Sequence, residues 1–147
     1  MYHYTECGLR NVWLANGYRT IETEYGKATA IENMEELHKV IGKQLATSKP
    51  HLTGAEFRFL RKELGLSQAR FGQPFDYDAQ TVALWERNKS RLPKWADRMI
   101  RLLYLEKVAG NAKVNELLER LHDLDRQEHE EKHIFQETAK GWVAQAA

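Results

Sequence analysis

The chain has 147 residues, of which 42% are hydrophobic and 29% are charged, and its formal net charge is only +1. This length supports one hydrophobic core of ordinary size, or two small ones. The single cysteine, Cys7, excludes a disulfide within the chain and a zinc site built from four cysteines. No apolar stretch approaches the ~20 residues of a membrane-spanning helix, and the N-terminal residues lack a signal-peptide pattern. We therefore expect a cytoplasmic protein with no membrane partner.

Charges are distributed unevenly along the chain. Residues 1–52 carry six basic and six acidic side chains, whereas residues 53–105 carry ten basic and six acidic ones. Residues 106–147 carry six basic and nine acidic side chains. A basic middle beside an acidic tail is typical of a DNA-binding module next to a solvated or partner-binding segment.

Residues 1–50 predict a small antiparallel β element followed by one helix. An Asn-Gly pair lies between residues 11–14 and 18–24, two segments rich in β-branched and aromatic side chains, and predicts a hairpin that joins them. A third strand is expected over residues 27–31. The helix begins after the cap residue Asn33. Its apolar stripe consists of Met34, Leu37, Val40, Ile41 and Leu45. We expect this region to mediate dimerisation or partner binding.

Residues 51–106 predict a helical module. The first helix is capped by Thr53 and extends to Leu64. Two short helices follow, capped by Ser67 and Asp78, and joined by a turn. The residues expected to face inward on the two sides of this turn are Leu66, Phe71, Phe75, Val82 and Trp85.

Further positions in this module have predicted orientations. Pro74 lies at the end of the first short helix and should shorten or kink it. A last helix is expected over residues 95–105. Its inward residues are predicted to be Met99, Leu102 and Leu103. The side chains expected outside the apolar faces are Arg58, Arg61, Lys62, Arg98 and Arg101.

Residues 107–147 predict a helical tail. One apolar stripe, suited to covering the module or pairing with a second copy, consists of Val114, Leu117, Leu118, Leu121 and Leu124. A final apolar cluster, expected to dock back on the fold, consists of Ile134, Phe135, Trp142 and Val143. The three segments together predict an α+β fold that is mainly α.

Residues 53–105 contain a set of short motifs at fixed spacing, formed by Leu66, Ser67, Gln68, Phe71, Gly72, Thr81, Val82, Trp85, Glu86, Arg87, Asn88, Lys89 and Pro93. With these residues the segment resembles the Xre, or Cro-type, family of bacterial and phage repressors. Asp76 and Asn88 stand where that family usually has glycine, and both residue types tolerate the left-handed conformation of a turn. The resemblance implies a five-helix, lambda-repressor-like helix-turn-helix domain in which Glu86 has a structural role.

A helix-turn-helix places the N-terminal residues of its second helix against base edges in the major groove of double-stranded DNA. In this chain the residues predicted to read bases are Ala79, Gln80, Thr81 and Leu84. Gln80 is the strongest candidate, because its amide can both donate to and accept from an adenine. The residues predicted to bind phosphates are Gln68, Arg87, Asn88, Lys89, Arg91 and Lys94.

These observations lead to two related functional hypotheses. The first is a homodimeric, sequence-specific repressor that binds an inverted repeat in the cytoplasm, associated with the nucleoid. The order of a small β element, a helix and a helix-turn-helix is also similar to the MqsA-type antitoxins. That similarity implies a toxin as protein partner, although the paired cysteines of those proteins are missing here.

One further motif suggests an enzyme. His129, Glu130 and His133 match the HExxH pattern of zinc proteases, in which two histidines bind the metal and the glutamate acts as a general base. The segment is surrounded by charged residues in a short chain and lacks a third ligand, so a solvated helix face is the better interpretation. We predict no enzymatic activity, no metal site and no cofactor.

Overall fold

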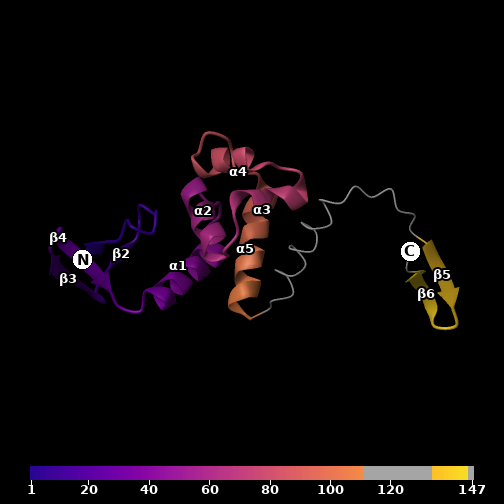
Figure 1. Cartoon of the computed structure of the whole chain (residues 1–147), viewed down its shortest axis with the longest axis horizontal. Coiled ribbons are helices and arrows are strands. Elements are labelled where there is room, and N and C mark those ends of the chain that lie inside the picture. Colours follow the sequence, from indigo (N-terminus) through magenta and orange to yellow (C-terminus); the bar gives the residue numbers. More distant parts are fainter. Residues whose placement is uncertain (111–133, 146–147) are drawn as a thin grey trace.

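The computed structural model describes residues 1–110 and 134–145, and Figure 1 shows its elements in chain order. The strands are β1 (Tyr2–His3), β2 (Trp13–Leu14), β3 (Tyr18–Thr23), β4 (Gly26–Ile31), β5 (Ile134–Thr138) and β6 (Gly141–Gln145). The α-helices are α1 (Met34–Ser48), α2 (Gly54–Glu63), α3 (Gln68–Gly72), α4 (Ala79–Glu86) and α5 (Lys94–Val108). A 3₁₀ turn, η1 (Gln73–Phe75), follows α3. This composition confirms the mixed, mainly α class.

The strand pairing differs from the predicted hairpin. β2 pairs with β1 rather than with β3, and β3 pairs with β4 along six residues of each strand. The turn between β3 and β4 is closed by Thr23, whose hydroxyl donates to the carbonyl oxygen of Gly26 at 2.7 Å. β3 gains six paired positions with β4, compared with the two that the short strand β2 could offer. Gly17 therefore lies in a bend between β2 and β3 and not in a hairpin turn.

The predicted helix starts are confirmed. Asn33, Thr53, Ser67 and Asp78 each accept a hydrogen bond on the side chain from the backbone amide three residues further on. Thr53 also forms a complete capping box, because the side chain of Glu56 accepts from the Thr53 amide at 2.8 Å. Short polar side chains therefore set where four of the five described α-helices begin.

The turn chemistry around α3 also follows the prediction. α3 ends at Gly72, and Pro74 lies in the 3₁₀ turn that follows, where its missing amide costs no helical hydrogen bond. Asp76 and Asn88 adopt left-handed conformations with φ of 62° and 55°. Both residue types tolerate this conformation, as predicted.

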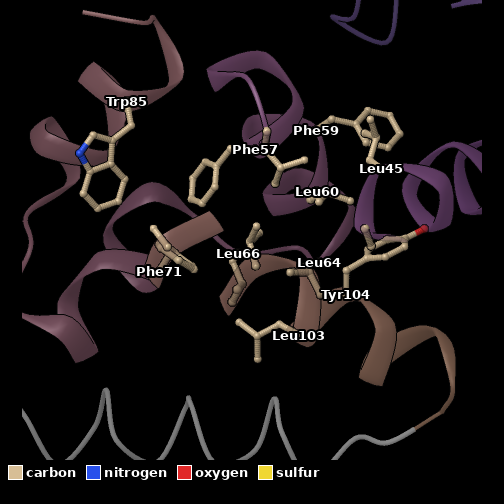
Figure 2. Packing of buried hydrophobic residues seen from close by; sticks show 14 of the residues in the cluster. Leu45, Phe57, Phe59, Leu60, Leu64, Leu66, Phe71, Trp85, Leu103 and Tyr104 are labelled. Atoms are coloured by element: carbon tan, nitrogen blue, oxygen red, sulfur yellow. The ribbon is translucent and has the colours of Figure 1, made fainter. Parts of the chain in front are cut away.

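One hydrophobic core joins the helices. Figure 2 shows Leu45, Phe57, Phe71, Trp85 and Leu103, from the five α-helices, gathered in a single cluster. The core crosses residue 50, because Leu45 and Ala46 of α1 belong to it. Residues 51–106 themselves contain four α-helices and η1, so the fifth helix of the bundle comes from the N-terminal region.

A hydrogen-bonded chain connects the first strands to this bundle. The hydroxyl of Tyr4 and Nε2 of His38 in α1 are hydrogen-bonded at 2.8 Å, and Nδ1 of His38 meets Oε1 of Glu63 in α2 at 2.8 Å. Tyr4 is buried, and this burial raises the pKa of its hydroxyl. The N-terminal segment is therefore attached to α1 and α2 through polar side chains as well as through Leu9.

Five predicted orientations are wrong. Leu102 is 59% exposed, because α5 packs on α1 and α2 with the face formed by Ala96, Ile100, Leu103 and Tyr104. Arg101 is inward instead, with its side chain only 11% exposed and paired with Asp97 one turn earlier. Arg61 is buried as well, and its partner is described below. On α1, Met34 and Val40 belong to the predicted stripe but remain exposed.

The tail differs from the prediction where it can be compared. The stripe from Val114 to Leu124 lies outside the described residues. Residues 134–145 form the antiparallel hairpin β5–β6 rather than a helix, and its turn repeats the threonine closure of β3–β4, with Thr138 donating to the Gly141 carbonyl oxygen at 2.8 Å. Its four apolar side chains, Ile134, Phe135, Trp142 and Val143, are exposed, so they are not buried against the other described residues.

Candidate nucleic-acid interface

The two short helices α3 and α4 are held at close range. A Cβ at Gly72, the last residue of α3, would clash with the carbonyl oxygen of Tyr77 in the turn. The amide of Tyr77 donates to the carbonyl oxygen of Gly72 at 3.0 Å. Only glycine permits this approach, so a single residue sets the spacing between α3 and the start of α4.

An aromatic cluster supports the inner side of α4. The indole of Trp85 lies edge-on to Phe57 of α2 and to Trp95 of α5, with ring centroids 6.1 and 5.9 Å apart. Tyr77, from the turn, lies 5.3 Å from Trp85 and 5.4 Å from Trp95 between ring centroids. Tyr77 stacks on Trp95, whereas the other three pairs are edge-to-face. Aromatic pairs in either arrangement add about 0.5–1.5 kcal/mol each beyond their buried area. They hold one face of α4 against the core.

A buried ion pair ties α4 to α2 and α3. Nε of Arg61 donates to Oε2 of Glu86 at 2.6 Å, and its second terminal nitrogen donates to Oε1 at 2.9 Å. The remaining terminal nitrogen of Arg61 donates to the Leu66 carbonyl oxygen at 2.9 Å. Gln68 completes the group by donating from its amide to Oε1 of Glu86 at 3.0 Å. This bidentate geometry fixes the direction of α4 as well as its position.

The network gives Gln68 a role within the fold. The sequence places it among the phosphate ligands, and one of the two N–H groups of its amide donates to Glu86. Glu86 has the structural role that the family resemblance implies. The sequence analysis did not predict the structural role of Arg61. The helical pattern around Arg61 does not indicate that a carboxylate 25 positions later, that of Glu86, will pair with it.

A second contact joins the end of α4 to the start of α2. Oδ1 of Asn88 accepts a hydrogen bond from the amide of Gly54 at 3.1 Å, so this side chain caps α2 from a distant loop. A Cβ at Gly54 would clash with the carbonyl oxygen of Trp85. Asn88, predicted to bind phosphate, thus uses its side-chain oxygen within the fold.

Of the predicted base-reading residues, Gln80 and Leu84 lie on the outward face of α4, and Ala79 and Thr81 flank it. Gln80 is exposed, while Ala79, Thr81 and Leu84 are half-buried. The Thr81 hydroxyl donates to Oδ1 of Asp78 at 2.7 Å, and the Thr81 amide donates to the same oxygen at 2.8 Å. These two hydrogen bonds, the hydroxyl's first, lower the pKa of the Asp78 carboxyl. The cap therefore keeps its negative charge, and the Thr81 hydroxyl uses its one donor on Asp78.

The loop after α4 gathers cations. Lys89 and Arg91 of this loop and Lys94, the first residue of α5, are exposed and line a hollow of about 500 Å³ together with His51. No acidic partner of these three side chains occurs among the described residues. Asp97 also borders the hollow, but its carboxylate is paired with Arg98 and Arg101 and accepts from the Leu52 amide at 2.8 Å. The hollow therefore presents a positive charge that other side chains in the described part of the chain do not neutralise.

Arg87 lies apart from this cation group. It is exposed at the C-terminal end of α4 and borders a second, larger groove of about 820 Å³. Residues 8–14, α1 and the start of α2 line the rest of that groove. Trp13 and Val40 are 56% and 57% exposed there, so the groove has an apolar surface open to solvent. The strand and helix patterns of residues 1–50 did not indicate it, because it forms only where the two segments meet.

The described residues contain no group of three histidine, cysteine or acidic side chains arranged to hold a metal ion. The HExxH-like segment, with His129, Glu130 and His133, lies outside the described residues. No described helix combines the length and the apolar character needed to cross a membrane.

Comparisons with known proteins add no family assignment. A scan against protein-family models, a search of curated proteins and a search of solved structures each found no match. Functional interpretation therefore depends on the geometry of α3, α4 and the cationic loop.

Proposed function

We propose that the chain is a sequence-specific DNA-binding transcriptional regulator. The observation that carries this proposal is the sequence of an exposed Gln80 on α4 followed by exposed cations just past the end of that helix. Lys89 and Arg91 lie in the loop after α4, Lys94 begins α5, and all three line one hollow. An exposed helix of this size fits the major groove, and cations beside it can hold the phosphates that border the groove. The Gln80 amide would read an adenine.

Rigid support is a second argument for this function. Glu86, Trp85 and Gly72 hold α4 from its inner side through an ion pair, aromatic contacts and close backbone packing. Reading base edges requires side chains placed by packed elements rather than by loose loops. Of the predicted phosphate ligands, Arg87, Lys89, Arg91 and Lys94 have exposed charges for that role. Gln68 and Asn88 also form hydrogen bonds within the fold, and each keeps a side-chain N–H that can donate to a phosphate.

The regulator would act as a homodimer on an inverted repeat. Two copies would place their α4 helices in successive major grooves, about 34 Å apart. We further propose that it acts in the cytoplasm, on nucleoid DNA, and represses its own operon or a neighbouring one.

A fluorescence anisotropy titration tests this function. The probe is the DNA upstream of the protein's own gene, at physiological salt with random competitor DNA. We expect saturable, nanomolar binding of two copies per site that weakens steeply with salt. If neither this probe nor any fragment of a genomic library binds more tightly than random DNA, sequence-specific regulation is contradicted.

The exposed groove between residues 8–14 and α1 favours a second candidate function, that of an antitoxin which also represses its operon. Trp13 and Val40 give the groove the apolar surface that a protein partner requires. Co-expression with the product of the adjacent gene tests this candidate. The partner should co-purify with the wild type and be lost with Val40→Asp, whereas Lys89→Ala should retain it.

A further inference from the structure

The outward face of α4 is chemically unusual for a surface that reads DNA. It presents Gln80, Ala83 and Leu84 along one side of the helix, while Val82, Trp85 and Glu86 are buried on the other. Ala83 and Leu84 are half-buried and purely aliphatic. Gln80 is thus the one side chain in the middle of this face that can form hydrogen bonds with a base edge.

The remaining polar groups of α4 are occupied or lie at its ends. The Thr81 hydroxyl donates to Asp78, and the carboxylate of Glu86 is paired with Arg61. Arg87 follows the last residue of α4, away from the N-terminal end that reaches base edges. Guanine is read by arginine or lysine and cytosine by a carboxylate. Neither type is available on the outward face within the helix.

Aliphatic side chains have one matching feature in the major groove, which is the C5-methyl group of thymine. We propose that Leu84 and Ala83 read thymine methyl groups beside an adenine read by Gln80, so that each half-site has a core of A·T pairs. This inference rests on the proposed DNA-binding function and specifies its ligand. Apolar contact and one amide would then provide the sequence preference, while the cationic loop provides affinity for any sequence.

The test begins with selection of binding sites from a random duplex library by the full-length protein. Thymines of the selected half-site are then replaced one at a time by uracil, which pairs in the same way but lacks the methyl group. Loss of one buried methyl contact should weaken binding about fourfold. Uracil outside the half-site should have no effect.

Two variants assign the contact. With Leu84→Ala, the difference between thymine and uracil should disappear at the position that Leu84 reads. Gln80→Ala should retain that difference while losing the adenine preference. Circular dichroism establishes whether each variant is folded, and should Leu84→Ala not fold, the uracil series on the wild-type protein decides by itself.

The outcomes separate this inference from the function it rests on. A selected site without thymine at its core, or equal binding of thymine and uracil sites, overturns methyl reading but leaves sequence-specific binding intact. A selection that enriches no sequence contradicts the proposed function and the inference together.

Discussion

Two groups of charged side chains in the helical bundle have opposite roles. Arg61, Glu86 and Asp97 are buried, the side chain of Arg101 is 11% exposed, and all four are paired with each other or with backbone groups. Lys89, Arg91 and Lys94 are exposed and have no acidic partner among the described residues. The excess of basic residues over residues 53–105 mixes these two groups. The net charge of a module therefore indicates whether it can attract DNA. The burial of each charged side chain then distinguishes those that support the fold from those that are free to contact a ligand.

The largest effect should follow from breaking the buried group. Glu86→Ala leaves the Arg61 guanidinium buried without its carboxylate, so we expect a loss of about 3–5 kcal/mol in the free energy of unfolding. Urea denaturation of the purified variant measures it.

The matched control removes both charges. Arg61→Met combined with Glu86→Leu should regain most of that stability, because an apolar pair avoids the uncompensated charge. If Glu86→Ala unfolds at the same urea concentration as the wild type, the ion pair does not hold α4 in place.

The next effect concerns base reading rather than stability. Gln80→Ala removes the single amide of the outward face and should cost about 1–3 kcal/mol in binding free energy at the selected site. Because Gln80 is exposed, the free energy of unfolding should change by less than about 0.5 kcal/mol. Anisotropy titrations on the selected site and on a random duplex measure both affinities. Equal losses on the two DNAs would show that Gln80 reads no base.

Lys89→Ala tests the role of the exposed cations in DNA binding. It should weaken binding to every sequence and reduce the slope of log affinity against log salt by about one. Lys62→Ala provides a control, since Lys62 is an exposed lysine of α2. If Lys89→Ala leaves the slope of log affinity against log salt unchanged, Lys89 does not contact a phosphate.

The smallest effect is a dependence of stability on pH. The pKa of Asp78 is lowered in the folded protein by its hydrogen bonds to Thr81, relative to the ordinary value of 3.8. The cap therefore stabilises the fold above pH 3.8, and this stabilisation is lost as the pH falls through the lowered folded pKa. Asp78→Asn keeps a capping oxygen without a charge and should show a flatter acid limb in urea midpoints measured against pH. Identical acid limbs would exclude a role for this carboxylate.

Local signals in the sequence determined most of the helical bundle. The caps Thr53, Ser67 and Asp78, the break at Pro74 and the left-handed turns at Asp76 and Asn88 depend on a few neighbouring residues, and all of them occur as predicted. The outward position of Gln80 also followed from helical spacing. Such features can be read in order along the chain because hydrogen bonds and backbone preferences within one turn decide them.

Tertiary structure alone decided the partners of groups far apart in the chain. β3 paired with β4 because a longer ladder was available there, and α1 joined the core across the expected boundary at residue 50. Arg61 pairs with Glu86, and Asn88 accepts a hydrogen bond from the amide of Gly54. The cations after α4 line one hollow. Residue identity shows which groups need a partner. Which partner each one finds depends on how the elements pack, and packing is a property of the whole chain.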